Sequence, residues 1–115
     1  MKKIFFACDT SSINTVIKII SQTKSRKLSI GYKFGLQFFY SKTGRKYISS
    51  LKGKLIWLDL KFKDIPNTVS SSIESLKDLT NINYLTVHCS GGFEMMKKSK
   101  IAVKKINRKL KILGV

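Results

Sequence analysis

The chain has 115 residues, of which 23 are Lys or Arg and 6 are Asp or Glu, so its formal net charge is +17. Hydrophobic residues make up 43 % of the sequence, which is enough for a buried core and excludes a disordered polar tail. Two Cys and one His are too few for a four-ligand structural zinc site or a disulfide framework, so we expect reduced thiols and a cytoplasmic protein. No run approaches the roughly 20 apolar residues that cross a bilayer, and we expect no membrane contact.

Four apolar, strand-like segments alternate with four helix-like segments. The strands are expected at Lys3–Cys8, Leu28–Phe34, Lys54–Leu60 and Tyr84–His88. A first helix should follow a cap at Ser11 or Ser12, a second should cover Tyr40–Leu51, and a third should begin near Pro66. The apolar faces of the first and third helices are expected to comprise Ile13, Val16, Ile17, Ile20, Val69, Ile73, Leu76 and Leu79.

The most basic segment is Lys97–Lys111, which has eight positive charges and no acidic residue. Its apolar residues recur every three or four positions, as on one face of a helix: Val103, Ile106, Leu110 and Leu113. We therefore expect a fourth helix whose lysines face solvent. Lysine supplies 20 of the 23 positive charges, which disfavours specific nucleic-acid binding, because arginine makes the bidentate phosphate and base contacts.

Strands that recur about every 25–30 residues, each followed by a helix, predict an α/β fold with a parallel sheet. A closed barrel and an open doubly wound sheet are both built in this way. Neither a G-x-G-x-x-G nor a G-x-x-x-x-G-K-[ST] segment follows a strand, which disfavours a dinucleotide site or a P-loop. Polar residues instead gather at the carboxyl ends of the strands, which is the catalytic face of a barrel: Asp9, Lys33, Asp59, Lys61 and His88.

Asp59 and Lys61 stand two positions apart, so in an extended segment their side chains share one face. A lysine beside carboxylates stays protonated and can donate a proton, while a carboxylate can repel a negative substrate group. Lys33, from the neighbouring strand, could hold Asp59 in place. A surface cluster of salt bridges is an equal alternative at this point.

The segment D-L-K-F-K-D-I-P-N-T-V, from Asp59 to Val69, resembles the signature of the orotidine 5′-phosphate decarboxylase family. The K-F-G segment at Lys33 and the V-H-C-S-G-G segment around His88 are similar to two further motifs of that family, and Asp9 stands where the family has an aspartate. The matches occur in order along essentially the whole chain. The D-x-K-x-x-D core is shared with related sugar-phosphate decarboxylases and aldolases, and the I-P-N-T continuation favours the orotidine enzyme.

The resemblance implies a role for each matching residue in converting orotidine 5′-monophosphate to UMP and carbon dioxide. Lys61 would protonate C6 of the pyrimidine, Asp59 would lie against the substrate carboxylate, and Lys33 and Asp64 would complete a charged network. Asp9 and Thr68 would bind the ribose hydroxyls. The positions of Asp64, Ile65 and Thr68 reach across a dimer interface in the family, which uses no metal or organic cofactor.

The family fold is an eight-unit (β/α) barrel, of which residues 1–115 resemble the first four units, an N-terminal half-barrel with no second domain. Leu113-Gly114-Val115 resembles the start of a fifth strand. We expect unpaired edges at the first and fourth strands, and a partner that is a second copy or a complementing C-terminal half. The alternatives are a sugar-phosphate decarboxylase or aldolase, and a non-enzymatic basic half-barrel that binds a polyanion or another chain.

Three further residues are expected to be structural. His88 should satisfy local hydrogen bonds at its strand end. Cys8 and Cys89 should be buried, inert thiols.

Overall fold

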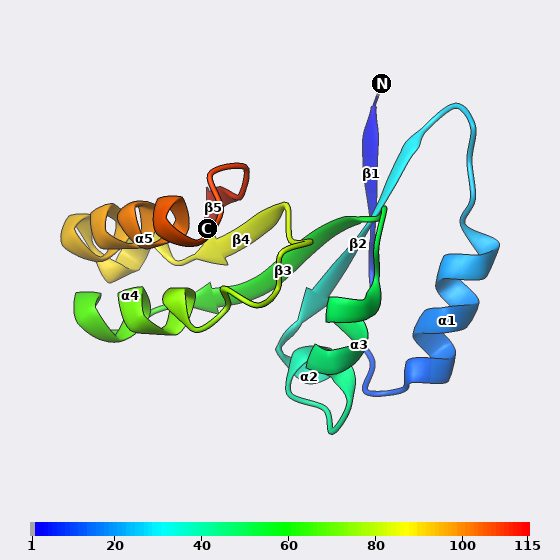
Figure 1. Cartoon of the computed structure of the whole chain (residues 1–115), viewed down its shortest axis with the longest axis horizontal. Coiled ribbons are helices and arrows are strands. Elements are labelled where there is room, and N and C mark those ends of the chain that lie inside the picture. The colour runs from blue at the N-terminus through cyan, green and yellow to red at the C-terminus, as the bar shows by residue number, and fades with distance from the viewer. Residues whose placement is uncertain (1) are drawn as a thin grey trace.

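The computed structural model describes residues 2–115, which form a five-stranded, entirely parallel sheet with the strand order β1-β2-β3-β4-β5 (Figure 1). The elements in chain order are β1 (Lys3–Ala7), α1 (Ile13–Gln22), β2 (Ser29–Gly35), α2 (Leu36–Phe39), α3 (Gly44–Ser50), β3 (Leu55–Phe62), α4 (Pro66–Glu74), β4 (Tyr84–Val87), the 3₁₀ turn η1 (Cys89–Gly91), α5 (Phe93–Ile106) and β5 (Lys111–Gly114). The four predicted strands are confirmed to within two residues at each end.

The helices cover only one face of the sheet. Strand residues that alternate along β2, β3 and β4 are buried beneath the helices: Tyr32, Phe34, Ile56, Leu58, Leu60, Leu85 and Val87. Register aligns these residues across the sheet, as in the row formed by Phe34, Leu58 and Leu85. Helices on one face, together with strands in sequential order, are the arrangement of a barrel segment and exclude the doubly wound alternative.

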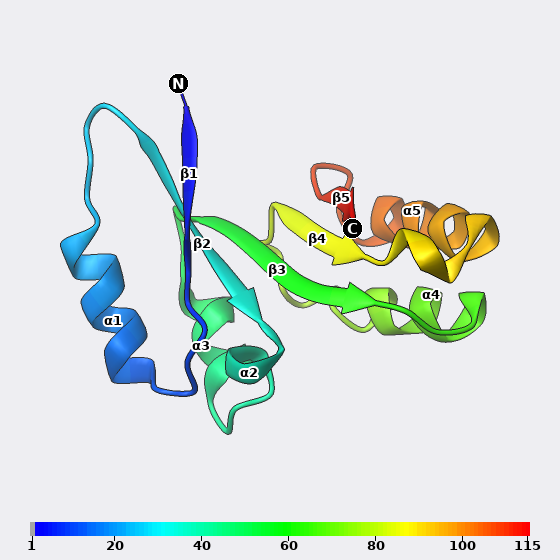
Figure 2. The same ribbon diagram turned by 180° about the vertical axis from the view of Figure 1, so that it is seen from behind.

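The opposite face of the sheet carries aromatic and charged side chains. Phe5 of β1 makes edge-to-face contacts with Trp57 at 5.4 Å and with Tyr84 at 5.6 Å between ring centroids. Lys3 donates a hydrogen bond to the Tyr84 hydroxyl at 2.9 Å. Seen from behind in Figure 2, the strands fan from upright β1 to nearly crosswise β4, so this face is strongly twisted.

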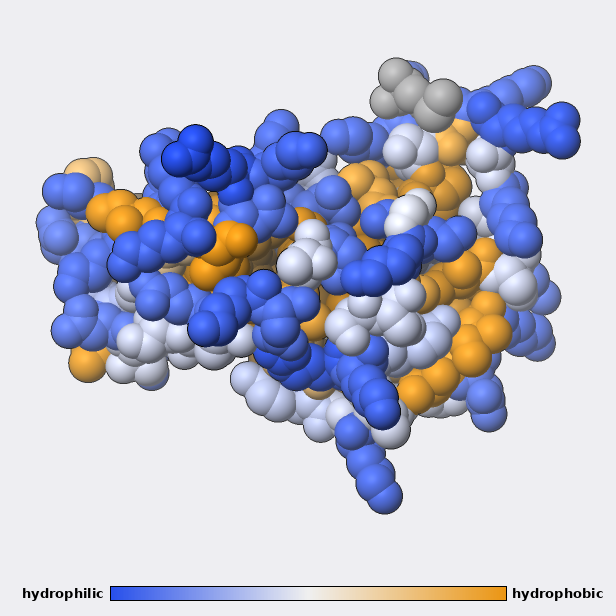
Figure 3. Space-filling model, in the orientation of Figure 1, coloured by the Kyte–Doolittle hydropathy of each residue, from blue (hydrophilic) through white to orange (hydrophobic). Residues whose placement is uncertain are grey.

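The first helix begins as predicted, because the Ser12 hydroxyl accepts a hydrogen bond from the Thr15 N–H at 3.2 Å. Its apolar face differs from the prediction at Ile17, which is 47 % exposed. Exposed Ile4 and Phe6 of β1 add to this apolar surface, and Figure 3 shows apolar surface in the part of the view that β1 and α1 occupy. Apolar surface therefore remains at the β1 end of the sheet.

The helix predicted over Tyr40–Leu51 is present but shorter, because α3 covers only Gly44–Ser50. The separate short helix α2 precedes the predicted range, and a turn joins the two helices. The Ser41 hydroxyl donates to the Phe38 carbonyl at 2.6 Å, which competes with helix continuation. A Cβ atom at Gly44 would collide with the same carbonyl, so the tight approach of α3 to α2 requires glycine.

The third and fourth helices end earlier than predicted. Helix α4 begins at Pro66 as expected but stops at Glu74, so Leu76 and Leu79 are buried in the turns that follow it. Helix α5 ends at Ile106, and Leu110 and Leu113 lie beyond it, in a turn and in β5. The expected fifth strand is confirmed as β5 and pairs with β4, so within residues 2–115 the edges of the sheet are β1 and β5 rather than the predicted first and fourth strands.

Candidate active site

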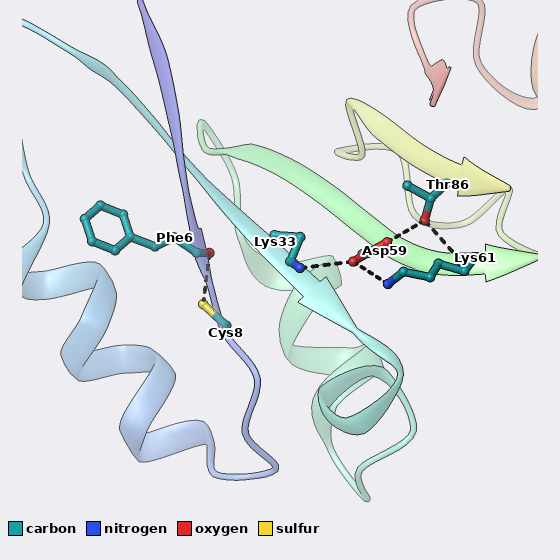
Figure 4. Close-up of polar contacts among 6 residues, drawn as sticks. All are labelled: Phe6, Cys8, Lys33, Asp59, Lys61 and Thr86. Carbon is teal, nitrogen blue, oxygen red and sulfur yellow. Dashed lines mark hydrogen bonds and ion pairs between the residues drawn. The ribbon is translucent and has the colours of Figure 1, made fainter. Parts of the chain in front are cut away.

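A buried carboxylate lies where β2 and β3 approach their carboxyl ends. Asp59 is 5 % exposed, and its Oδ2 atom accepts from the ammonium groups of Lys33 at 3.0 Å and Lys61 at 2.8 Å (Figure 4). Its Oδ1 atom accepts from the Thr86 hydroxyl at 2.8 Å. We call these four residues the Asp59 cluster. Two cations and one hydroxyl offset the cost of burying the carboxylate.

Sheet register places Lys33 and Asp59 within reach of each other. Lys33 pairs with Trp57, and the next pair on the same face of the sheet, opposite the helices, is Gly35 with Asp59. The Lys33 ammonium also lies 5.7 Å from the centroid of the Trp57 ring, which favours a cation over the ring face. The Lys33 ammonium therefore lies over an aromatic ring and reaches the carboxylate from there.

An irregularity in β3 positions Lys61. The register between β3 and β4 shifts between Leu58 and Phe62, and Lys61 has a φ of 48°, in the left-handed region. Its backbone N–H donates to the Thr86 hydroxyl at 3.0 Å. The Lys61 side chain donates to the Asp59 carboxylate across this irregular segment. A regular strand would also place the side chains of Asp59 and Lys61 on one face, because they are two residues apart.

The cluster keeps Asp59 ionised. Burial alone raises the pKa of the Asp59 carboxyl, because it penalises the charged form. Hydrogen bonds from Lys61, Thr86 and Lys33 outweigh this effect and hold its pKa below the usual value of 3.8. The Lys61 side chain is 46 % exposed, so its ammonium group is both paired with a carboxylate and open to a ligand.

Comparison with known proteins agrees with this geometry. The sequence model of the orotidine 5′-phosphate decarboxylase / HUMPS family matches residues 2–115. The chain belongs to this family. It is 33 % identical over 116 aligned residues to an orotidine 5′-phosphate decarboxylase of Malacoplasma penetrans, with 99 % of this chain and 48 % of the relative covered. It is 45 % identical over 85 residues to the enzyme of that name from Staphylococcus saprophyticus, covering 72 % of this chain and 36 % of the relative.

Solved structures of the orotidine decarboxylase family confirm the barrel fold. The crystal structure of orotidine 5′-phosphate decarboxylase from Lactobacillus acidophilus superposes with a TM-score of 0.86 at 31 % identity, covering 99 % of this chain and 52 % of that one. The enzyme of Methanocaldococcus jannaschii, complexed with the inhibitor BMP, has the same fold, with a TM-score of 0.80 at 24 % identity. The chain spans about half the length of the curated relatives it matches.

Four residues that the family resemblance singled out lie outside the Asp59 cluster. Asp9 is exposed after β1, and its Oδ1 atom would lie 3.6 Å from a Cβ atom at Gly35, so it reaches the same end of the sheet. Asp64 accepts a hydrogen bond from the Ile65 N–H at 2.7 Å, and within residues 2–115 it makes no ion pair with Lys61. Ile65 is 66 % exposed, and Thr68 is exposed in the first turn of α4.

Sequence reasoning missed Thr86, which is fully buried and contacts both Asp59 and Lys61. Threonine is common in β-strands, so its presence in β4 does not by itself indicate a functional residue. Its place two residues before His88 did point to the site. Alternate residues of a strand share a face, and His88 was expected at the carboxyl end of this strand, where the site lies.

The structure corrects two expectations about the remaining candidates. Cys8 is buried as predicted, and burial, with the Asp9 charge, raises the pKa of its thiol to about 11, so it is inert at neutral pH. Cys89 is exposed in η1, which contradicts the predicted burial. The His88 backbone N–H donates to the Phe62 carbonyl at 2.9 Å, but its side chain makes no hydrogen bond within residues 2–115.

Residues 2–115 contain no group of three or more His, Cys, Asp or Glu side chains that could hold a metal ion. No helix among them has the length and apolar character needed to cross a bilayer.

Proposed function

We propose that this chain carries the reaction centre of an orotidine 5′-phosphate decarboxylase, which converts orotidine 5′-monophosphate to UMP and carbon dioxide. The observation that carries the proposal is the half-exposed Lys61 ammonium 2.8 Å from the buried Asp59 carboxylate. The names of the relatives, which match over the whole of this chain, support the same reaction.

In the proposed reaction, the substrate carboxylate lies against Asp59, and repulsion between the two anions raises the energy of the bound substrate. The bond from C6 to the carboxylate breaks, carbon dioxide leaves, and the electron pair stays on C6. Lys61 donates its proton to C6 and recovers a proton from solvent. Lys33 holds Asp59 in its ionised form.

The remaining site residues have binding roles in this proposal. Asp9 and Thr68 bind the ribose hydroxyls. Asp64, Ile65 and Thr68 serve a site shared across a homodimer or with a complementing chain, in which residues 1–115 form the N-terminal half of the barrel. Their exposure, and the lack of a hydrogen bond or ion pair between Asp64 and the Asp59 cluster within residues 2–115, support this role.

The proposed chemistry needs no metal or organic cofactor, since the proton donor and the repelling anion are both side chains. We also propose a cytoplasmic location, which is supported by the two unpaired cysteines, Cys8 and Cys89.

The experiment is decarboxylation of orotidine 5′-monophosphate by the purified chain, followed by ultraviolet absorbance. Lys61→Ala should lower the rate by about 100-fold or more, because it removes the proton donor. Lys63→Ala is the matched control, since Lys63 is exposed and outside the Asp59 cluster, and its rate should stay near the wild-type value. Equal rates for wild type and Lys61→Ala would contradict the proposal. Turnover of a keto-sugar phosphate, without turnover of orotidine monophosphate, would favour the alternative function of a sugar-phosphate decarboxylase or aldolase.

A further inference from the structure

The Thr86 hydroxyl joins the two parts of the site that the proposed reaction uses. Thr86 lies in β4 and is 0 % exposed. Its oxygen is 2.8 Å from Asp59 Oδ1 and 3.0 Å from the Lys61 backbone nitrogen (Figure 4). The direction of both hydrogen bonds is fixed by chemistry, because the Lys61 N–H can only donate and the ionised carboxylate can only accept. The single hydroxyl proton therefore points to Asp59.

This arrangement separates the two oxygens of the carboxylate. Oδ1 receives the neutral hydroxyl, while Oδ2 receives the ammonium groups of Lys33 and Lys61. A carboxylate held at both oxygens has one fixed orientation, so its Oδ2 edge stays directed at the lysines.

The same hydroxyl stabilises the unusual backbone of Lys61. The register of β3 against β4 shifts at this point, and Lys61 has left-handed backbone geometry, with a φ of 48°. Its N–H is bonded to a side chain of β4 rather than to the backbone of that strand. Thr86 therefore takes the place of a backbone acceptor, and its β-branched side chain has few χ1 rotamers to choose from.

We propose that Thr86 is a positioning residue, which orients the Asp59 carboxylate and the Lys61 backbone together through one hydroxyl group. Its effect on turnover rests on the proposed decarboxylase function, whereas its effect on Asp59 and Lys61 can be measured in the resting protein.

The first experiment measures the protonation of Asp59 by carbon-13 NMR of the carboxyl groups. The chain has only four aspartates and two glutamates, and Asp59→Asn identifies the Asp59 signal. Thr86→Val removes the hydroxyl and keeps the shape, and we expect it to raise the pKa of Asp59 by about one unit. Thr86→Ser should keep most of the wild-type value.

Ser99→Ala is the matched control for loss of a buried hydroxyl. Ser99 is also 0 % exposed, but its hydroxyl donates to the Met95 carbonyl within α5, away from the site. Its loss should leave the titration of Asp59 unchanged. An unchanged Asp59 titration in folded Thr86→Val, or an equal shift in Ser99→Ala, would overturn the proposal.

A second measurement does not depend on the folding of any variant. The Lys61 amide of the wild-type protein should show slow hydrogen exchange, since it is bonded to the buried Thr86 oxygen. Exchange at the rate of a free amide in an otherwise protected β3 strand would contradict the positioning role.

The last measurement is steady-state turnover of orotidine monophosphate. In protein that decarboxylates orotidine monophosphate, Thr86→Val should lower kcat about tenfold with little change in KM, and Thr86→Ser should recover most of the rate. A rise in KM at constant kcat would overturn a positioning role in the reaction. Lack of turnover in the wild type would instead count against the proposed function, while the NMR and exchange results decide the role of Thr86 separately.

Discussion

Lys33 and Asp59 meet at 3.0 Å although they are not partners in the sheet register. Lys33 pairs with Trp57, and the backbone partner of Asp59 is Gly35, which has no side chain to fill the space beside the carboxylate. Lys33, two residues before Gly35 on the same face of the sheet, can therefore reach along the sheet to the buried Asp59 carboxylate. The contact depends on the length of the lysine side chain on β2.

Replacing Lys33 tests this diagonal contact. Lys33→Met keeps the apolar stem beside Trp57 but removes one of the two cations on Asp59 Oδ2. We expect the pKa of Asp59 to rise and the rate of decarboxylation to fall at least about tenfold. Lys54→Met, at a partly buried position before β3, is the control, and a carbon-13 titration with a turnover assay would detect both effects. An equal loss in the two variants would argue against a specific role for Lys33.

Acid should destabilise the wild-type protein more steeply than Asp59→Asn. Burial raises the pKa of Asp59, and the hydrogen bonds from Lys61, Thr86 and Lys33 lower it further than burial raises it. A folded-state pKa below the unfolded value contributes stability that is present above the unfolded pKa, near 3.8, and lost as pH falls through the folded pKa.

Urea unfolding at several pH values below about 5 would measure this difference. The free energy of unfolding should fall more steeply with decreasing pH in wild type than in Asp59→Asn. Asp64→Asn, which changes an exposed carboxylate outside the cluster, should follow the wild-type curve more closely. Parallel curves for wild type and Asp59→Asn would show that the cluster does not couple folding to pH.

The two cysteines should differ in their reactivity. Cys89 is exposed, whereas Cys8 is fully buried and has a thiol pKa of about 11. A thiol reagent at neutral pH should therefore modify one cysteine in the native protein and both in urea. Mass spectrometry of the native product should place the label on Cys89, and rapid labelling of Cys8 would contradict its burial.

Gly44→Ala should destabilise the protein by about 2–4 kcal/mol, because the new Cβ would collide with the Phe38 carbonyl and force α2 and α3 apart. Gly53→Ala is the comparison, since a Cβ there meets no atom within 4 Å and is opposed only by a φ of 67°. That change should cost about 1 kcal/mol. Thermal unfolding of both variants would measure the difference, and a smaller loss for Gly44→Ala would refute the steric argument.

Much of the fold follows from patterns within short segments. The short apolar segments at β2 and β3 predict strands, and Ser12 and Pro66 predict the starts of two helices. The errors arise where one local contact overrides a longer pattern. Spacing alone placed Leu110 and Leu113 on a helix, but helix α5 ends at Ile106 and both residues lie beyond it.

The candidate site was only partly predictable for a related reason. The pairing of Lys33 and Lys61 with Asp59 follows from strand alternation and neighbouring strand ends. The hydrogen bond from Lys61 to Thr86 depends on the register shift between β3 and β4, and no residue type in either strand predicts that shift. A left-handed lysine is equally unexpected, because propensity favours glycine or asparagine in that conformation.

The left-handed backbone at Lys61 sets local stability against the proposed chemistry at a single position. Glycine adopts a φ of 48° without steric cost, so Lys61→Gly should relax the backbone at the same time as it removes the ammonium group. A substitution chosen only to raise thermal stability at this residue would therefore remove the proposed proton donor. The proposed proton donor therefore stands at a position whose backbone conformation favours glycine.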